Sequence, residues 1–345
     1  MEKKRVTVRD VAKIADVHFT TVSRALIKHP SIPISTCERI RKIADDLGYV
    51  PDPMLSALTA YRTNLRSPTF HGTLAWLNNS FSRNGWNTCT TFELYRKGAA
   101  TRAQELGYRL DDFWLREPGM TSRRAVEIFA ARNIRGLIVP PQPRAKMRLR
   151  FDWERFAAVS FGFTLAWPAL HRVTINAFHA MQTTVRHLRA MGYRRPGLVV
   201  TANTDARINR AWSGGFLSLQ SDWPAVQRLP VHMPRTMCDE GFLKWLRATE
   251  PDVVISQEFH LLEVLEQNGY SIPRDIGFAT QTLTSYEHTR KICGIDENAE
   301  QTGAAAVNLL VGMIHRSEWG IPLMMQSLLI EGTWRDGDTL KRQAA

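Results

Sequence analysis

Apolar and polar positions alternate at helical spacing over the first fifty residues. From Val8 to Ala15 apolar residues recur at i, i+3, i+4 and i+7, and Thr7 precedes Asp10 at the spacing of a capping box. A second stretch, Phe19 to Leu26, is apolar on one face and polar on the other. The pattern predicts two short amphipathic helices joined by a tight turn.

A third helix is predicted between Ser35 and Gly48. Ser35 and Glu38 have capping-box spacing, apolar residues follow at helical intervals, and Gly48 is a residue type that ends helices. Helices this short are unstable in isolation, so the three must share one small core. We expect residues 1–50 to form a helical domain.

Residues 51–68 have the composition of a linker that contains a short helix. Asp52 can cap a helix and Pro53 suits the first helical turn, so the helix is expected from Pro53 to about Leu58.

Beyond Pro68 the chain alternates between apolar runs and amphipathic helices. The apolar runs, interpreted as strands, are residues 71–79, 108–115, 135–141, 156–163, 172–176, 195–200, 226–232, 251–257 and 276–282. The helices are expected at 91–106, 122–133, 178–191, 208–219, 237–248 and 260–268. This alternation implies parallel sheets covered on both faces. About ten strands exceed one comfortable sheet, so two α/β lobes with a cleft between them are expected over residues 69–345.

The charge balance favours a polyanionic partner. The 345 residues carry a formal net charge of +12, and residues 1–66 hold 12 Lys and Arg against 7 Asp and Glu, so the front end is the more basic part. Clustered cations gain affinity for phosphate by releasing counterions, although charge alone does not choose between nucleic acid and a membrane surface. No membrane-length apolar run and no secretory signal pattern occurs, so we expect a cytoplasmic protein with no membrane partner.

The sequence contains no motif of a metal site or an enzyme. Cys37, Cys89, Cys238 and Cys293 lie far apart, without Cys-x-x-Cys or zinc-finger spacing. The Gly-x-Ser-x-Gly, phosphate-loop and His-Glu-x-x-His patterns are absent as well. We therefore expect no metal, no cofactor and no catalysis.

Two short helices, the second with a polar outer face, are typical of the helix-turn-helix, which lays its second helix in the major groove of DNA. Ordinary helical pairs bury Ala and Val in the same way, so spacing alone leaves both interpretations open. The basic front end and its position before a linker favour DNA binding.

Specific motifs extend this interpretation to a family resemblance. The succession Asp-Val-Ala, Thr-Val-Ser-Arg and Leu-Gly-Tyr-x-Pro resembles the DNA-binding head of the lactose-repressor (LacI) family of bacterial transcription regulators. The stretches NIRGLIVPP, MGYRRPGLV and SIPRDIGF stand at that family's landmarks, so the resemblance covers nearly the whole chain. It implies a periplasmic-binding-protein-like core of two parallel-sheet lobes joined by three crossovers around a small effector. Lobe one is expected at about 69–170 and 298–322, and lobe two at about 171–297 and 323–340.

The resemblance also implies which residues of the head contact DNA. Phe19 and Thr20 fall at base-reading positions, where Thr20 can bond to a base edge and the Phe19 ring can contact a thymine methyl group. Arg24 closes the Thr-Val-Ser-Arg signature. The hydroxyl groups expected to position phosphates belong to Thr7, Thr21, Ser23 and Thr36. The alternatives are that Phe19 packs on the first helix, that Thr21 and Ser23 are merely solvated, and that Arg24 pairs with an acid.

The hinge pattern of the family matches at Tyr49, Pro51, Asp52, Leu55 and Leu58. It implies that two hinge helices of a homodimer fold on DNA, with Leu58 as a wedge in the minor groove. Asp52 and Leu55 depart from the Asn and Ala usual in the family. The alternative is that Leu55 and Leu58 pack on the core.

Two further departures lie at the turn of the head. Asp16 stands where the family has a small turn residue, and His18 stands where a Ser would cap the second helix. A weaker cap costs about 1 kcal/mol, so the fold survives while the operator preference can differ.

The effector positions depart further from the sugar-binding pattern of the family, because amides, a hydroxyl and an aromatic ring replace most of its charged groups. The candidate effector residues are Asn79, Asn176, Arg210, Trp212, Gln257, Glu258 and Thr282. Such groups still suit hydroxyls and sugar rings, so a carbohydrate, another small molecule and a loss of effector control all stay open. Plain burial is the alternative for Trp212.

The resulting hypothesis is a dimeric transcription regulator, a repressor, that binds a near-palindromic operator and responds to a small-molecule effector. The alternative is a cytoplasmic solute-binding module or sugar-converting enzyme whose front helices mediate protein contacts. Deletion of residues 1–66 discriminates between them, because only a regulator loses binding to duplex DNA.

Overall fold

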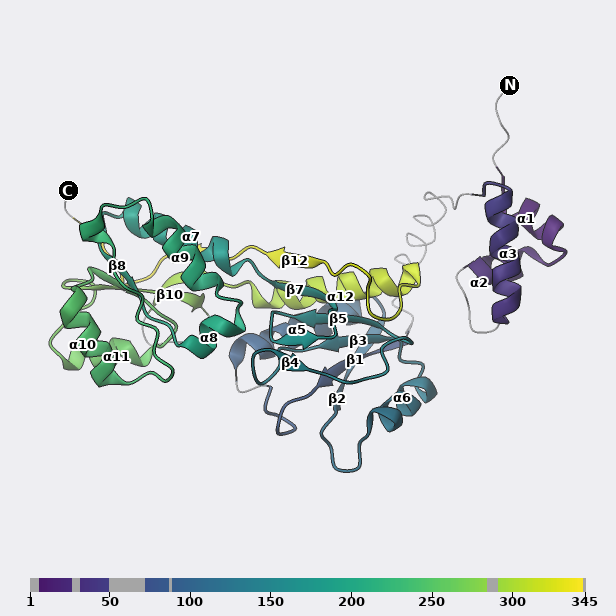
Figure 1. Ribbon diagram of the computed structural model, residues 1–345, viewed down its shortest axis with the longest axis horizontal. Coiled ribbons are helices and arrows are strands. Elements are labelled where there is room, and N and C mark those ends of the chain that lie inside the picture. The colour runs from purple at the N-terminus through teal and green to yellow at the C-terminus, as the bar shows by residue number, and fades with distance from the viewer. Residues whose placement is uncertain (1–5, 27–31, 50–71, 87–88, 284–290, 344–345) are drawn as a thin grey trace, which may run out of the picture. The chain divides into compact units, whose positions relative to one another are not determined.

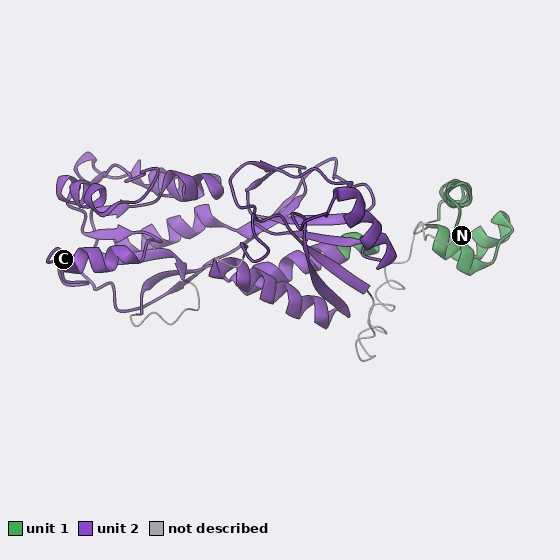
Figure 2. Cartoon of the chain, turned by 90° about the horizontal axis from the view of Figure 1, so that it is seen from below, with its two compact units in different colours: residues 1–71, 312–318 green, residues 72–311, 319–345 purple. Residues whose placement is uncertain are grey.

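The computed structural model describes residues 6–26, 32–49, 72–86, 89–283 and 291–343 (Figure 1). The chain divides into two compact units, one of residues 1–71 with 312–318 and one of residues 72–311 with 319–345 (Figure 2). The expected hinge helix, including Leu55 and Leu58, lies outside the described residues.

The head contains the three expected helices, α1 (Val8–Ala15), α2 (Phe19–Leu26) and α3 (Ile34–Asp46). Their shared core is apolar, and its fully or almost fully buried members are Val11, Ala15, Val22, Ala25, Ile40 and Ala44. The capping box at Thr7 is confirmed, since its hydroxyl accepts from the Asp10 N–H while the Asp10 carboxylate accepts from the Thr7 N–H. Periodicity therefore predicted the three helices of this domain correctly, and capping predicted the start of α1.

The expected capping box of the third helix is wrong. Helix α3 begins at Ile34, and no side chain of its N-cap residue, Pro33, bonds to the backbone. The Pro33 carbonyl instead accepts the first helical hydrogen bond, from the Cys37 N–H at 3.0 Å. The N-cap is thus two residues earlier than a capping box at Ser35 indicates, which places Ser35 inside the first turn.

The first lobe of the core is built on a six-stranded parallel sheet in the order β12-β7-β5-β3-β1-β2. Its strands are β1 (Gly72–Asn78), β2 (Tyr108–Trp114), β3 (Gly136–Val139), β5 (Ala157–Phe161), β7 (His171–Ile175) and β12 (Ser327–Ile330). The helices are α5 (Thr90–Glu105), α6 (Ser122–Ala131) and α12 (Ala299–Arg316). Strands β3 and β5 are wholly buried, as expected for a parallel sheet covered on both faces.

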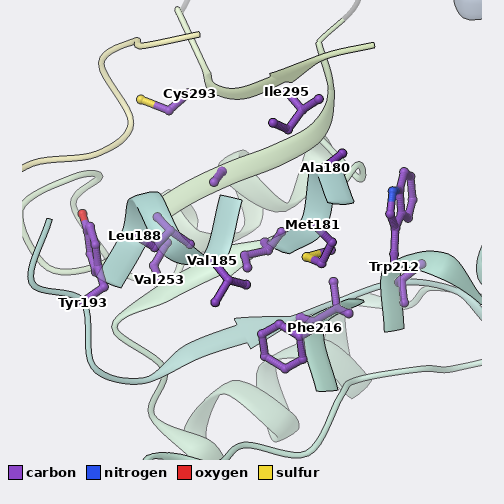
Figure 3. Close-up of a cluster of buried hydrophobic side chains, with 14 of the residues drawn as sticks. Ala180, Met181, Val185, Leu188, Tyr193, Trp212, Phe216, Val253, Cys293 and Ile295 are labelled. Atoms are coloured by element: carbon purple, nitrogen blue, oxygen red, sulfur yellow. The ribbon is translucent and has the colours of Figure 1, made fainter. Parts of the chain in front are cut away.

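The second lobe has a five-stranded sheet in the order β13-β11-β10-β9-β8, in which only β13 is antiparallel among the described strands. Its strands are β8 (Pro196–Leu198), β9 (Val253–Ile255), β10 (Gly277–Leu283), β11 (Cys293–Asp296) and β13 (Thr333–Arg335). Its helices are α7 (Ala177–Ala190), α8 (Ala202–Arg207), α9 (Ala211–Gln220), α10 (Asp239–Thr249) and α11 (His260–Gln267). The α7 and α9 side chains pack with β9 and β11 in one apolar cluster (Figure 3). The expected two-lobed fold is confirmed.

Several elements of the second lobe differ from the sequence expectation, which included no counterpart of α8, β11 or β13. The helix expected at 208–219 begins later, at Ala211 as α9, and the separate helix α8 precedes it, because Asn209 and Arg210 between them both adopt left-handed backbone angles (φ 58°). The strand expected at 226–232 is replaced by a short 3-10 turn, η1 (Ala225–Gln227), and an isolated bridge at His232. Pro230 explains the second difference, since proline cannot donate a ladder hydrogen bond.

A small sheet of β4 (Met147–Arg148) and β6 (Leu165–Trp167) was not expected from the sequence. Two and three residues are too few for a recognisable alternation of apolar and polar positions.

The chain passes between the two lobes at three short segments, at Asn176, at Glu297 and Asn298, and at Glu331. These segments meet, since the Asn176 amide donates to Glu331 Oε1 at 2.7 Å and the Asn298 amide donates to the Glu331 carbonyl at 2.8 Å. The lobe boundaries expected at 170/171 and 322/323 therefore fall several residues too early. Strands β7 and β12 pair with each other in the first lobe, so both crossings come after these strands.

Candidate DNA-binding face and effector site

Helix α2 presents one polar face to solvent. Phe19, Thr20, Ser23 and Arg24 are exposed on it, and Phe19 keeps 43% of its surface accessible. Spacings of one, four and five residues place these side chains on the same side of a helix. Thr21 is half-buried beside them, because it borders the buried Val22. The structure thus brings together four of the residues that the resemblance implies for DNA contact.

His18 organises the start of this face. Its Nδ1 accepts from the Thr20 N–H at 3.4 Å and lies 2.8 Å from the Thr20 hydroxyl. The ring therefore takes over part of the capping role that the sequence comparison assigned to a Ser. It also contacts Phe19, with the two ring centroids 4.3 Å apart.

Arg9 of α1 is a residue of this face that sequence reasoning missed. Its guanidinium lies over the Phe19 ring, 5.9 Å from the centroid. Phe19 thus contacts the first helix, as one alternative predicted, and it also stays exposed, as a contact with DNA requires. The contact could not be recognised from the sequence, because Arg9 and Phe19 lie ten positions apart on different helices and come close only in the folded head.

The other head residues expected to contact DNA differ in their exposure to solvent. Thr7 is exposed at the start of α1, where its hydroxyl also donates to Asp10 Oδ2 at 2.7 Å. Thr36 is half-buried in the first turn of α3, and Tyr49 is half-buried against the core of the head. Arg39 holds α1 to α3 by donating to the Ala15 carbonyl at 3.0 Å.

Asn79 lies at the carboxyl end of β1, where ligands bind in open α/β sheets. It is buried, its amide donates to Gln142 Oε1 at 3.0 Å, and its oxygen accepts from Arg116 Nε at 3.1 Å. The Gln142 N–H in turn donates to the Thr164 hydroxyl at 2.7 Å. Asn79 therefore belongs to a polar network at the end of the first sheet.

Arg207 of α8 reaches this network from the second lobe and was missed by sequence reasoning. Its Nη1 donates to the Gln142 carbonyl at 2.9 Å. Burial lowers the pKa of Arg207, because a charged group is less well solvated there. The available signal was that the segment after the strand β8, whose helix α8 ends at Arg207, lies where parallel sheets place their ligand-binding loops.

Gln257 and Glu258 follow β9 and are brought together. The Gln257 amide donates to Glu258 Oε1 at 3.0 Å, and the Glu258 N–H donates to the Ser256 hydroxyl at 3.1 Å. Gln257 Oε1 is buried without a hydrogen-bond partner among the described residues. A buried acceptor of this kind is costly unless a water or ligand donates to it.

The remaining effector candidates are scattered. Trp212 is only 4% exposed and packs with Met181 and Phe216 in the apolar cluster of the second lobe (Figure 3). Asn176 caps α7, since its oxygen accepts from the His179 N–H, and Arg210 is exposed before α9. Thr282 is half-buried near the end of β10. Trp212 is thus a buried core residue, and Asn176 lies where the chain crosses from one lobe to the other.

Glu297 is a buried carboxyl group that the sequence did not single out. Its Oε2 accepts from the Thr91 hydroxyl at 3.1 Å, and it lies at the crossing from β11 to α12. Burial raises the pKa of Glu297 to about 7, and the charge of Asp296 acts in the same direction. Burial likewise raises the pKa of the neighbouring Tyr95 hydroxyl and of the Cys89 thiol.

Within the described parts of the chain, His, Cys, Asp and Glu side chains form no group that could hold a metal ion. No helix there is long and apolar enough to cross a membrane.

Family models match both the head and the core of the chain. The model of bacterial regulatory proteins of the lacI family matches residues 7–52, and the model of the periplasmic binding protein-like domain matches residues 185–331. The HTH-type transcriptional regulator PtxS of Pseudomonas plecoglossicida is 28% identical over 193 residues, which are 56% of this chain and 53% of that protein. The probable HTH-type transcriptional repressor ExuR of Bacillus subtilis is 39% identical over 59 residues, 17% of this chain and 18% of that protein. The matched stretches thus span about half of the first relative and about a fifth of the second.

Solved structures share the fold at low sequence identity. The complex of the transcriptional regulator CelR with cellobiose has a TM-score of 0.58 at 17% identity, covering 97% of this chain and all of that one. The lac repressor dimer bound to operator and the anti-inducer ONPF has a TM-score of 0.56 at 16% identity, covering 98% of this chain and all of that one.

The fold and the exposed face of α2 define a helix-turn-helix head joined to a two-lobed, periplasmic-binding-protein-like core. The head is similar to the lacI family of bacterial regulatory proteins, and the core is similar to the periplasmic binding protein-like domain, in that order along the chain.

Proposed function

We propose that this protein is a sequence-specific transcription regulator, a repressor, that binds a near-palindromic operator as a homodimer in the cytoplasm. The exposed face of α2 carries the proposal, because Phe19, Thr20, Ser23 and Arg24 converge there on a head that the family model matches. The proposed activity is binding and not catalysis.

The proposed readout divides the head residues by role. Thr20 and the Phe19 ring contact base edges in the major groove, and Arg24 and Arg9 bring positive charge beside them. Backbone positioning falls to Thr7, Thr21, Ser23 and Thr36. Tyr49, Leu55 and Leu58 form the proposed hinge contact, of which Tyr49 alone lies among the described residues.

A small-molecule effector is proposed to bind between the two lobes and to shift the affinity for DNA. The solved relatives are described as a complex with cellobiose and as a dimer with operator and anti-inducer, so a carbohydrate is one candidate. Linkage requires that an inducer bind the DNA-free form more tightly and a corepressor the DNA-bound form.

The salt dependence of DNA binding tests the proposed interface. If the two heads neutralise about six phosphates, log affinity falls with log salt at a slope near −5, so affinity drops about a thousandfold between 50 and 200 mM salt. Fluorescence anisotropy with a labelled duplex measures this slope. A flat response would contradict the proposed phosphate contacts, and Arg123→Gln on the exposed face of α6 is the control that should leave the slope unchanged.

A further inference from the structure

The carboxyl edge of the six-stranded sheet carries an unusual concentration of guanidinium groups around one aromatic ring. Phe81 follows β1 and is 55% exposed. Arg116 lies 4.9 Å and Arg144 lies 5.1 Å from the centroid of its ring. Two cations therefore flank an exposed ring beside the buried Asn79, to which Arg116 donates.

Arg207 adds a third cation from the opposite lobe. Its hydrogen-bond partner is the Gln142 carbonyl, and no carboxylate of the described residues lies within ion-pair distance of it. A partly buried guanidinium loses hydration, and a neutral carbonyl offsets only part of that loss. Arg207 thus has donors available for a negatively charged group.

The acids near this edge are already engaged or lie elsewhere. Glu117 is 3.9 Å from Arg83, and Glu258 accepts from Gln257 in the second lobe. The direct neighbours of Arg207 in the network, Gln142 and Asn79, are neutral amides. Among these side chains the edge therefore has an excess of positive charge.

We propose that the effector is a small organic anion whose carboxylate or phosphate binds the Arg207 guanidinium, which the network of Asn79 and Gln142 holds in place at this edge. The inference rests on the proposed function in that it assigns the chemistry of the effector of the same regulator. Arg116 and Arg144, beside the exposed Phe81 ring, raise the local concentration of anions at this edge.

The test compares neutral compounds with their acidic counterparts on the full-length protein. The probes are D-glucose against D-gluconate and D-glucose 6-phosphate, and D-galactose against D-galacturonate, in thermal unfolding and calorimetry at constant ionic strength. At least one acidic member should raise the midpoint of unfolding where its neutral counterpart does not. Gluconate and galacturonate report a carboxylate site, and glucose 6-phosphate reports a phosphate site.

Variants locate the binding of the anion. Arg207→Gln should weaken the acidic probe at least tenfold, Arg207→Lys should weaken it less, and the exposed Arg186→Gln on α7 should leave it unchanged. Arg144→Gln, on the surface, provides a second variant that does not depend on a buried position and should weaken the probe severalfold.

Three outcomes would overturn the proposal: equal stabilisation by neutral and acidic members, no stabilisation by any acid, or acid binding that is unaltered in both Arg207→Gln and Arg144→Gln. Duplex binding by the wild-type protein without any probe reports on the proposed function separately. If no acidic probe binds, duplex binding still tests the proposed function, and if the duplex does not bind, the acidic probes still test the anion site.

Discussion

Removal of residues 1–66 is expected to lower the affinity for the preferred duplex by about a thousandfold or more, to the level of non-specific binding or below. The exposed face of α2 and the guanidinium of Arg9 are lost with this segment, and 12 of the 45 Lys and Arg residues go with it. Anisotropy titrations of the full-length and truncated chains, at one salt concentration, measure the difference.

The core should keep its fold in the truncated protein, because both of its sheets lie between residues 72 and 335. Thermal unfolding of the truncated chain with and without an acidic probe checks this. Unchanged duplex binding after truncation would support the alternative of a solute-binding module or sugar-converting enzyme with a front segment for protein contacts.

Replacement of Glu297 by Gln is expected to make the core more stable at alkaline pH. The folded protein raises the pKa of this carboxyl group from its ordinary 4.5 to about 7, so the folded state binds the proton more tightly than the unfolded state. Stability from this group is thus fully present below pH 4.5 and is lost as the pH rises through 7. The cost reaches about 3 kcal/mol near pH 8.

The Glu297→Gln variant keeps a side-chain oxygen that can accept from the Thr91 hydroxyl, and it removes the titration. Denaturant unfolding between pH 5 and pH 8 should therefore show a gap between variant and wild type that widens with pH. Glu263→Gln, on the exposed face of α11, should follow the wild type at every pH. A gap that stays constant with pH would show that Glu297 does not titrate in this range.

Sequence patterns predicted the helices of the head because the residues that form its core and its first cap lie close together along the chain. The spacing of Val11, Ala15 and Val22 defines one apolar core, and the Thr7 capping box forms within four residues. The start of α3 was misplaced because its N-cap residue, Pro33, makes no side-chain capping bond, so a search for capping side chains selected Ser35 inside the first turn instead.

Periodicity predicted most strands of the core up to residue 282, but not β11, α12, β12 and β13 beyond it, and not the lobe boundaries. Each crossing lies after its strand, and only the pairing of β7 with β12 shows to which sheet these strands belong. Such pairing joins residues about 150 positions apart, which a pattern along the chain does not encode.

The effector site was the least predictable part. Family positions indicated Trp212 and Asn176, yet the first fills the apolar cluster and the second caps α7 between the lobes. Arg207 entered the network only through the fold, because its contact with Gln142 joins segments 65 residues apart. The chemistry of this site depends on burial and on the positions of charged groups, and both are known only once the chain is folded.

The central claim is that the face of α2 reads a DNA sequence, and selection from a randomised duplex library by the full-length protein tests it most directly. We expect enrichment of one near-palindromic motif with two half-sites, and a changed or lost half-site preference for Thr20→Ala. The absence of any enriched motif, or the same motif selected equally by the chain without residues 1–66, would contradict the claim.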